Sequence, residues 1–328
     1  MAVALIERAG ADPVTRTRPL DEPTEPRFLA YSITKTFTAA LFLQLQEGGE
    51  LALDDTLARW LPPVPRSERV TLRLLLNHTA GIPDYGGMAA YHQAVRETPS
   101  RAWGFERYAA ETYAKGLLFE PGEGWAYSNP GYMLLRRVAE DVTSHPFRQL
   151  LEERIAAPLG LRHTAVVETT RDLADLAPAT SRALATDGTP VDVRRHYDPG
   201  WVSHGVIAST ASDLARFLDA LLAGGLVGQE SVAEMTQLTR VPVPGSDADP
   251  AARPYRWREP HYGLGLMVDT GAPWGPVYGH NGAGPGYSAS VFRAPGLGGV
   301  TACVLGAEAP GFAAEQVVFA VLDVLANR

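Results

Sequence analysis

The residues that could do chemistry begin with a serine and a lysine three positions apart, Ser32 and Lys35, at the predicted start of an apolar helix. Side chains three apart on a helix lie on the same side, one turn apart. A lysine amine removed from water can lose its proton and then accept one, so this spacing suits an activated serine nucleophile. The alternative is a capping serine followed by a solvated lysine.

Lysine is rare in this chain. Of the 29 basic residues only Lys35 and Lys115 are lysines, and the other 27 are arginines. Arginine stays protonated at working pH, whereas a desolvated lysine can be neutral. We therefore infer that Lys35 is present to take part in proton transfer, so that an arginine in its place is expected to keep the charge and lose the activity.

Two further short motifs come later in the chain. The sequence Tyr-Ser-Asn at 127–129 follows a Pro-Gly turn and precedes a predicted helix, and His-Asn-Gly at 280–282 ends a predicted strand. The first could equally be a buried tyrosine beside a helix cap, and a His-x-Gly sequence is expected by chance in a chain with 32 glycines. The order of the three motifs carries more information than any one of them.

In that order the motifs resemble those of the penicillin-recognising serine hydrolases, in which a Ser-x-x-Lys element is followed by a second polar motif and then by a basic-x-Gly strand. The Tyr-x-Asn and His-x-Gly forms of the second and third motifs are similar to those of one branch of these hydrolases. That branch holds class C β-lactamases, D-Ala-D-Ala carboxypeptidases and related esterases. Segments 74–82, 209–225 and 262–266 agree as well, and the resemblance covers roughly residues 28–306.

The resemblance implies a role for each catalytic residue. Ser32 attacks an ester or amide carbonyl and forms an acyl-enzyme, and Lys35 shares its proton network. Tyr127 is implied as the general base of acylation, with its phenol pKa lowered by the nearby ammonium. Because the two groups titrate together, either Lys35 or Tyr127 could hold the proton. His280 replaces a more usual lysine and is expected to tune protonation or to hold a substrate carboxylate or carbonyl.

The resemblance also implies where the substrate lies. Asn129 is expected to hydrogen-bond the acyl side chain or Lys35, and the backbone N–H groups of Ser32 and Ala283 would form the oxyanion hole. Small residues let substrate backbone lie along that strand edge. The substrate-binding positions are Asn129, Asn281, Gly282 and Ala283, and the possible aromatic contacts are Tyr85, Trp103, Trp257, Trp274 and Tyr287. Helix packing is the alternative for the aromatic residues.

The pattern of the elements that position these residues predicts an α+β chain, in which an antiparallel sheet built from both chain ends is flanked by helices and a mainly helical region is inserted. The resemblance implies that this fold is of the β-lactamase/transpeptidase type. We expect one catalytic unit over 1–328, with its sheet region at about 1–30 plus 262–328 and its helical region at about 31–261. Strands are expected at 2–8, 14–18, 262–270, 275–280, 286–293 and 299–306. Helices are expected at 33–47, 70–77, 88–97, 104–115, 130–142, 146–156, 209–223 and 311–327, with Asp213 in a capping box.

Composition narrows the partners. A net charge of −8 without a basic block argues against nucleic acid and against an anionic membrane surface. Cys303 is the single cysteine, so no disulfide is expected, and the histidine spacings give no ligand pair, so we predict no metal and no cofactor. His78 is expected to be structural. The apolar start of the chain lacks a basic leader, so the expected location is cytoplasmic.

The function predicted is that of a serine hydrolase acting on an ester or amide of a small metabolite. Three alternatives stay open: an acyltransferase that passes the acyl group to an alcohol or amine, a D-Ala-D-Ala carboxypeptidase or β-lactamase, and a non-catalytic binding protein on the same fold. Four intact residues (Ser32, Lys35, Tyr127 and His280) argue against the last. The sequence leaves the oligomeric state open.

Overall fold

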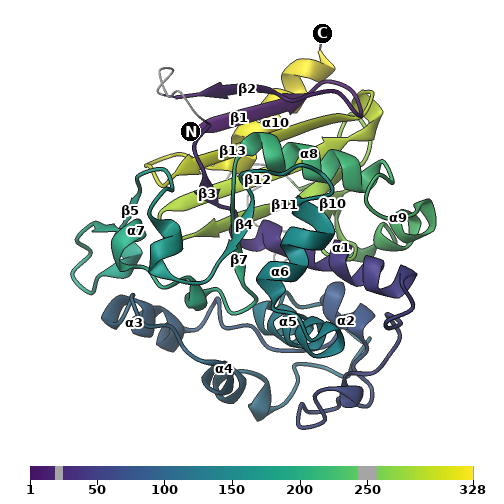
Figure 1. The fold of residues 1–328 in the computed structure, drawn as a ribbon, viewed down its shortest axis with the longest axis vertical. Coiled ribbons are helices and arrows are strands. Elements are labelled where there is room, and N and C mark those ends of the chain that lie inside the picture. Colours follow the sequence, from purple (N-terminus) through teal and green to yellow (C-terminus); the bar gives the residue numbers. More distant parts are fainter. Residues whose placement is uncertain (19–24, 243–256, 328) are drawn as a thin grey trace.

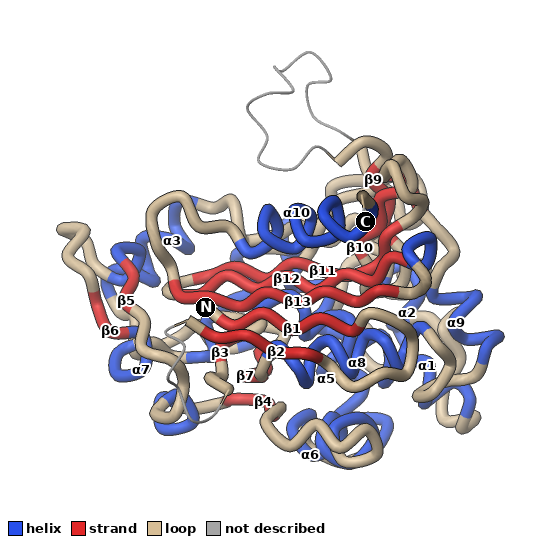
Figure 2. The backbone as a smooth tube through the Cα atoms, turned by 90° about the horizontal axis from the view of Figure 1, so that it is seen from above, coloured by secondary structure: helices blue, strands red, loops and turns tan. Residues whose placement is uncertain are grey.

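The structure is a computed structural model that describes residues 1–18, 25–242 and 257–327. Its centre is an eight-stranded antiparallel sheet with the strand order β2-β1-β13-β12-β11-β10-β9-β8 (Figures 1 and 2). Its strands are β1 (Ala2–Ile6), β2 (Val14–Thr17), β8 (Thr239–Arg240), β9 (Pro260–Tyr262), β10 (Met267–Asp269), β11 (Val277–Gly284), β12 (Tyr287–Ala294) and β13 (Val300–Ala307). The predicted sheet from both chain ends is confirmed, and β8 and β9 extend it upstream of residue 262.

Ten α-helices occur in the described part of the chain. They are α1 (Thr34–Glu47), α2 (Leu72–Leu76), α3 (Ala89–Glu97), α4 (Phe105–Glu111), α5 (Asn129–Thr143), α6 (Phe147–Leu151), α7 (Val193–His196), α8 (Ala211–Leu222), α9 (Gln229–Met235) and α10 (Ala314–Ala326). Two expected helices are shorter than predicted: a 3₁₀ turn at Tyr113–Lys115 follows α4, and a π-helical turn at Glu152–Ala156 follows α6.

The core lies on both faces of the sheet. Along β13, Cys303 and Leu305 pack in the cluster that contains α1 and α8, whereas Ala302 and Val304 pack in the cluster that contains α10. Figure 2 shows α10 on one side of the sheet and α8 on the other. Because successive side chains of a strand point to opposite faces, a strand covered on both sides is apolar throughout. This explains the unbroken apolar run around Cys303, which is buried as expected.

Smaller sheets were not predicted from the sequence. Strands β3 (Phe28–Leu29), β7 (Val206–Ser209) and β4 (Ala165–Val167) form a three-stranded antiparallel sheet, and β5 (Thr180–Ser181) pairs with β6 (Val191–Asp192). Strands of two to four residues leave too short a pattern for periodicity to detect. The first of these sheets joins the segment just before Ser32 to the segment just after His204, so it fixes two parts of the site relative to each other.

Helix caps agree with the sequence in one case and differ in another. Thr71 caps α2 by accepting a hydrogen bond from the N–H of Leu74, and threonine is a residue type that favours this position. Thr210 caps α8, but the carboxylate of Asp213 accepts hydrogen bonds from the His163 N–H and the Thr164 hydroxyl instead of closing a capping box. Segments 9–27 and 240–262 fall partly outside the described residues. No helix of the described residues is long and apolar enough to cross a bilayer.

Candidate active site

Ser32 and Lys35 are brought together by the first turn of α1 and the 3₁₀ turn before it, η1 (Tyr31–Ile33). The Nζ atom of Lys35 lies 3.2 Å from the Oγ atom of Ser32, and the Lys35 side chain is fully buried. Tyr31 has a φ of 45°, which is strained for a non-glycine residue, and its hydroxyl donates to the Pro285 carbonyl at 2.6 Å. That contact holds η1 against the end of β11.

The Lys35 amine has three polar neighbours. They are Ser32 Oγ, Asn129 Oδ1 at 2.7 Å and His204 Nε2 at 2.8 Å. An ammonium has three donors, so three acceptors satisfy it completely. Burial holds the pKa of Lys35 well below its usual value, and the carboxylate of Asp84 opposes that shift. The amine can therefore lose its proton far more easily than a solvated lysine.

Asn129 is oriented by a residue that the sequence analysis missed. Asp84 Oδ1 accepts hydrogen bonds from the Asn129 backbone N–H at 2.9 Å and from its Nδ2 at 3.0 Å. The amide oxygen of Asn129 is therefore turned toward Lys35. Ser128, and not Asn129, caps α5. Asp84 lies in a Gly- and Pro-rich loop, where an aspartate is typical of a turn, so its type alone was no signal of a site.

Tyr127 lies beside the serine, but its pKa moves opposite to the prediction. Its hydroxyl is hydrogen-bonded to Ser32, and the Lys35 Nζ lies 4.9 Å from the centre of its ring. Burial raises the pKa of the Tyr127 phenol well above its usual value, and the hydrogen bond to Ser32 offsets only part of that rise. The expected lowering by the ammonium is wrong because desolvation dominates, so the phenol stays protonated.

His280 is buried behind the site and carries no charge. Its Nδ1 lies 2.6 Å from the Asn281 carbonyl, which can only accept, so Nδ1 carries the hydrogen and Nε2 accepts from the Tyr262 hydroxyl at 2.9 Å. Burial, and next the charge of Lys35, lower the pKa of His280 to about 3. With both nitrogens engaged, His280 has no free donor for a substrate carboxylate or carbonyl, contrary to one of the two roles expected for it.

The two residues after His280 face opposite sides of β11. Asn281 donates through Nδ2 to Glu315 Oε1 on α10 at 2.6 Å and accepts from Ser290 at 2.8 Å, so it points away from Ser32. Its expected place among the substrate-binding residues is therefore wrong, because strand side chains alternate. Gly282 lies where a Cβ atom would come 2.0 Å from the Ala30 carbonyl, so only glycine lets β11 approach η1.

Strand β11 is open at the edge that faces η1. It pairs with β10 only through Val277–Gly279, so residues 280–284 have β12 on one side and η1 on the other. Ser32 and Ala283 both line the cavity beside this edge. The arrangement suits an oxyanion hole made by their two backbone N–H groups, which stays a prediction.

A cavity of about 320 Å³ opens beside Ser32. We call it the Ser32 cavity; it is lined by Tyr31, Ser32, Tyr85, Gly86, Tyr91, His92, Val95, Arg96, Asn129, Ala183, Tyr197, Trp201, Val202, His204, Ala283, Gly284 and Pro285. Of the five aromatic contacts predicted, Tyr85 lines it. Trp257 and Trp274 pack with the α10 cluster on the far side of the sheet, and the Tyr287 hydroxyl donates to the Ala177 carbonyl in the core.

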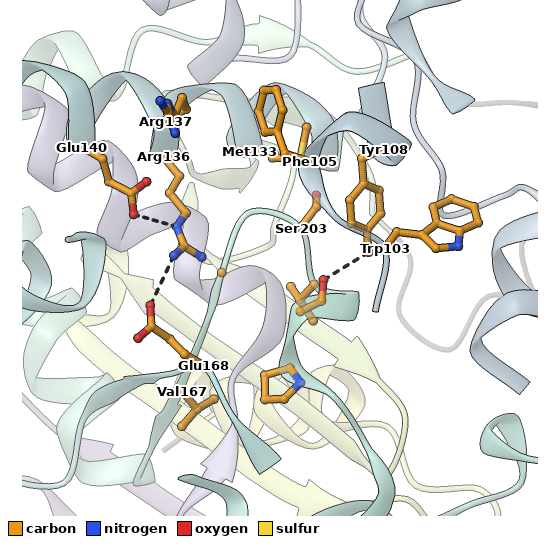
Figure 3. Close-up of a pocket in the computed structure, with 14 residues that line it drawn as sticks. Trp103, Phe105, Tyr108, Met133, Arg136, Arg137, Glu140, Val167, Glu168 and Ser203 are labelled. Carbon is orange, nitrogen blue, oxygen red and sulfur yellow. Dashed lines mark hydrogen bonds and ion pairs between the residues drawn. The ribbon is translucent and has the colours of Figure 1, made fainter. Parts of the chain in front are cut away.

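Trp103 lines a second cavity of about 320 Å³, which we call the Arg136 pocket (Figure 3). There the Arg136 guanidinium lies between two carboxylates, 3.1 Å from Glu140 Oε1 and 3.3 Å from Glu168 Oε1. Segment 199–205 separates the two cavities and lines both.

Two of the site histidines, His78 and His204, are buried, and burial lowers the pKa of each. His78 accepts a hydrogen bond from the Ser128 N–H, as a structural residue would.

The chain is similar to known proteins over most of its length. Residues 4–322 match the family model described as Beta-lactamase. Penicillin-binding protein 4* of Bacillus subtilis is 28% identical over 85% of this chain and 60% of its own, and esterase EstB of Burkholderia gladioli is 26% identical over 80% of this chain and 75% of its own. The chain spans about half to three fifths of the length of the first curated relatives that it matches.

A solved structure gives a similar result. The D-stereospecific amidohydrolase from a Streptomyces species is 31% identical and superposes with a TM-score of 0.75 over 92% of this chain and 88% of its own. The sheet with its flanking helices is thereby accounted for. The chain belongs to the β-lactamase family.

Proposed function

We propose that this protein is a serine hydrolase that cleaves an ester or an amide of a small molecule through an acyl-enzyme on Ser32. The observation that carries the proposal is the buried Lys35 amine, whose Nζ lies 3.2 Å from Ser32 Oγ and whose pKa is held low by burial. A lysine in that environment is a base at neutral pH. The names of an esterase and an amidohydrolase among the similar proteins support it.

Acylation follows from the protonation states. The neutral Lys35 amine takes the Ser32 hydroxyl proton as Oγ bonds to the substrate carbonyl carbon, and the carbonyl π electrons move onto the oxygen. The N–H groups of Ser32 and Ala283 would stabilise that oxyanion. When the tetrahedral intermediate collapses, the leaving group departs with a proton from the Tyr127 phenol, and the Lys35 ammonium returns a proton to the phenolate.

Deacylation reverses these transfers with water in place of the leaving group. The Tyr127 phenol takes a proton from the attacking water as it passes its own proton to the neutral Lys35 amine, and the water oxygen bonds to the acyl carbon. The Lys35 ammonium then protonates Ser32 Oγ as it leaves. This assigns Tyr127 as the acid toward the leaving group and Lys35 as the base toward Ser32. The raised pKa of the Tyr127 phenol supports that division, because a phenol that stays protonated holds a proton for the leaving group and cannot be the base toward Ser32.

Turnover of p-nitrophenyl butyrate by purified protein tests the proposal. We expect release of p-nitrophenolate by the wild type and a loss of roughly a thousandfold or more in Ser32→Ala, since the nucleophile is removed. Ser100→Ala is the matched control, because Ser100 is exposed and is not among the residues that line the Ser32 cavity. Equal turnover by the two variants would contradict the proposal.

Hydrolysis is favoured over acyl transfer by the names of the similar proteins, which include an esterase and an amidohydrolase. The Ser32 cavity is lined by Ser32, Asn129 and Ala283, so it lies beside the nucleophile and the proposed oxyanion hole. The acyl part of the substrate is accordingly assigned to it. Trapping the acyl-enzyme and adding alcohols or amines distinguishes the two activities: faster release with an acceptor than with water alone would establish acyl transfer. A cytoplasmic location stays a prediction from the sequence.

A further inference from the structure

Among the described residues, one arginine and no carboxylate side chain line the Ser32 cavity. Arg96 lies in the last turn of α3 and is half-buried. Within the described residues it makes no ion pair and no side-chain hydrogen bond, whereas Arg136 in the neighbouring pocket has two carboxylate partners. A cation that is partly withdrawn from water and has no partner leaves the cavity positively charged, in a protein whose net charge is −8.

Much of the rest of the lining is aromatic or aliphatic, and Ser32, His92, Asn129 and His204 are its other polar side chains among those that have no aromatic hydroxyl. Tyr31, Tyr91 and Trp201 are among the aromatic residues of the lining. The Tyr31 hydroxyl already donates a hydrogen bond to the Pro285 carbonyl, and the Tyr91 hydroxyl donates one to the Trp201 carbonyl. Val95 adds an aliphatic wall. The cavity can therefore bury a hydrocarbon chain or a ring, and Arg96 is its one full positive charge.

We propose that this cavity binds an acyl group that is apolar along its length and carries a carboxylate, which pairs with Arg96. The inference rests on the proposed function, because it is the Ser32 acyl-enzyme that places the acyl part in this cavity. An arginine binds a carboxylate with two parallel hydrogen bonds, and a partly desolvated pair of this kind is stronger than a solvated one. The substrate class is thus the esters or amides of dicarboxylic acids or of other acyl groups with a free carboxylate.

The test compares two esters with the same leaving group, p-nitrophenyl butyrate and mono-p-nitrophenyl glutarate, whose acyl chain ends in a carboxylate. The measured quantity is the ratio of kcat/KM for the glutarate ester to kcat/KM for the butyrate ester. We expect the wild type to prefer the glutarate ester and Arg96→Gln to lower the ratio roughly tenfold, because one charge-assisted hydrogen-bonded pair is lost. Arg96→Glu is expected to lower it further.

The matched control is Arg101→Gln, because Arg101 is exposed, has the same charge and lies outside the cavity. Its ratio should equal that of the wild type. A wild type that prefers the butyrate ester, or equal ratios in Arg96→Gln and Arg101→Gln, would overturn the inference and leave the proposed function standing. No turnover of either ester by the wild type would instead overturn the proposed function.

A second observation, independent of Arg96, concerns His204. Its side chain is buried, its Nε2 lies 2.8 Å from the Lys35 Nζ, and its Nδ1 has no hydrogen-bond partner within the described residues. Neither its spacing nor its neighbours in the sequence marked it. The structure assigns His204 as a positioning residue that accepts one N–H of Lys35 while Asn129 accepts another, so that the remaining position on the nitrogen, an N–H in the ammonium and the lone pair in the neutral base, stays aimed at Ser32 Oγ.

The groups that face His204 come from four elements. They are Lys35 on α1, His78 after α2, Tyr132 and Arg136 on α5, and His280 on β11. Burial, then the charges of Lys35 and its other neighbours, lower the pKa of His204, so the ring is a neutral acceptor toward the ammonium. Removing an acceptor disfavours the protonated amine and lowers the pKa of Lys35 further.

The pH dependence of kcat for p-nitrophenyl butyrate tests this role. Because the base is the neutral Lys35 amine, activity rises as the pH passes the pKa of Lys35. We expect His204→Leu to lower kcat roughly tenfold and to move that rise to lower pH, and His204→Gln, which keeps an acceptor, to restore part of both. A rise at the wild-type pH in His204→Leu would overturn the assignment, because a purely structural role does not shift it.

Discussion

The Ser32 cavity and the Arg136 pocket have the same volume of about 320 Å³ and share the wall formed by segment 199–205, yet their charges are arranged differently. In the Arg136 pocket the guanidinium lies between Glu140 and Glu168 (Figure 3). In the Ser32 cavity Arg96 has no carboxylate partner within the described residues. An arginine neutralised by two carboxylates stabilises the fold, whereas an unpaired one is available to a ligand.

The polar groups of the two cavities also differ in what they are directed at. Around Ser32 they converge on one atom, the Lys35 Nζ, which contacts three acceptors from separate elements. Around Arg136 the charges satisfy one another and none is directed at a nucleophile. Size and aromatic lining are shared, so they do not distinguish a reactive cavity from a structural one. The convergence of polar groups on the Lys35 Nζ is the feature that distinguishes the two.

The largest effect is expected from Lys35→Arg. The arginine keeps the positive charge but stays protonated, so it cannot accept the Ser32 proton, and kcat should fall roughly a thousandfold. Lys115→Arg is the matched control, because Lys115 is exposed and paired with Glu111 on the surface. Circular dichroism would show that both variants fold. Activity of Lys35→Arg within tenfold of the Lys115→Arg control would contradict the role given to the amine.

A second prediction concerns the buried histidines near Ser32. Burial lowers the pKa of His78, His204 and His280, that of His280 to about 3, whereas in the unfolded chain each is near 6.5. The unfolded state therefore binds more protons below pH 6.5, and stability falls as the pH falls through this range. Each histidine contributes up to about 1.4 kcal/mol per pH unit.

Urea unfolding at about pH 7 and at about pH 5.5 measures this effect. The free energy of unfolding should decrease by a few kcal/mol, and the decrease should be smaller in His280→Gln, which removes one titrating group. His145→Gln is the control, because His145 is exposed. Equal free energies at the two pH values in the wild type would show that these histidines are not held neutral.

The smallest effect is expected from Arg136→Gln. It leaves Glu140 and Glu168 without their cation, and since all three side chains are partly exposed the loss should be about 1 kcal/mol. A decrease of a few degrees in Tm is expected, together with an unchanged ratio of activity toward the glutarate and butyrate esters. A change in that ratio as large as the one in Arg96→Gln would remove the distinction between the two arginines.

The sequence allowed the residues on α1 and beside α5 to be predicted, because Ser32 and Lys35 are one helical turn apart and Asn129 belongs to a short motif. The alternation of a strand could also have shown that Asn281 faces away from His280 and Gly282. Asp84 and His204 could not be found in this way. Each lies in an irregular segment, and each reaches the site only because the tertiary fold brings that segment to Lys35.

The direction of the Tyr127 pKa was not predictable for a related reason. A nearby ammonium lowers a phenol pKa and burial raises it, and only the packed structure shows that burial dominates. The same holds for Arg96, since only the folded cavity shows that no carboxylate among the described residues lines it beside this arginine. The single unit over 1–328 and the oxyanion hole stay predictions.

The most direct test of the account is the mass of the protein after reaction with a fluorophosphonate, followed by peptide mapping. The reagent forms a covalent bond to an activated serine oxygen, so one adduct on the peptide that contains Ser32 is predicted, with none in Ser32→Ala and a much slower reaction in Lys35→Arg. Ester turnover with no adduct on Ser32, or an adduct on another residue that abolishes turnover, would contradict the central claim that Ser32 is the nucleophile.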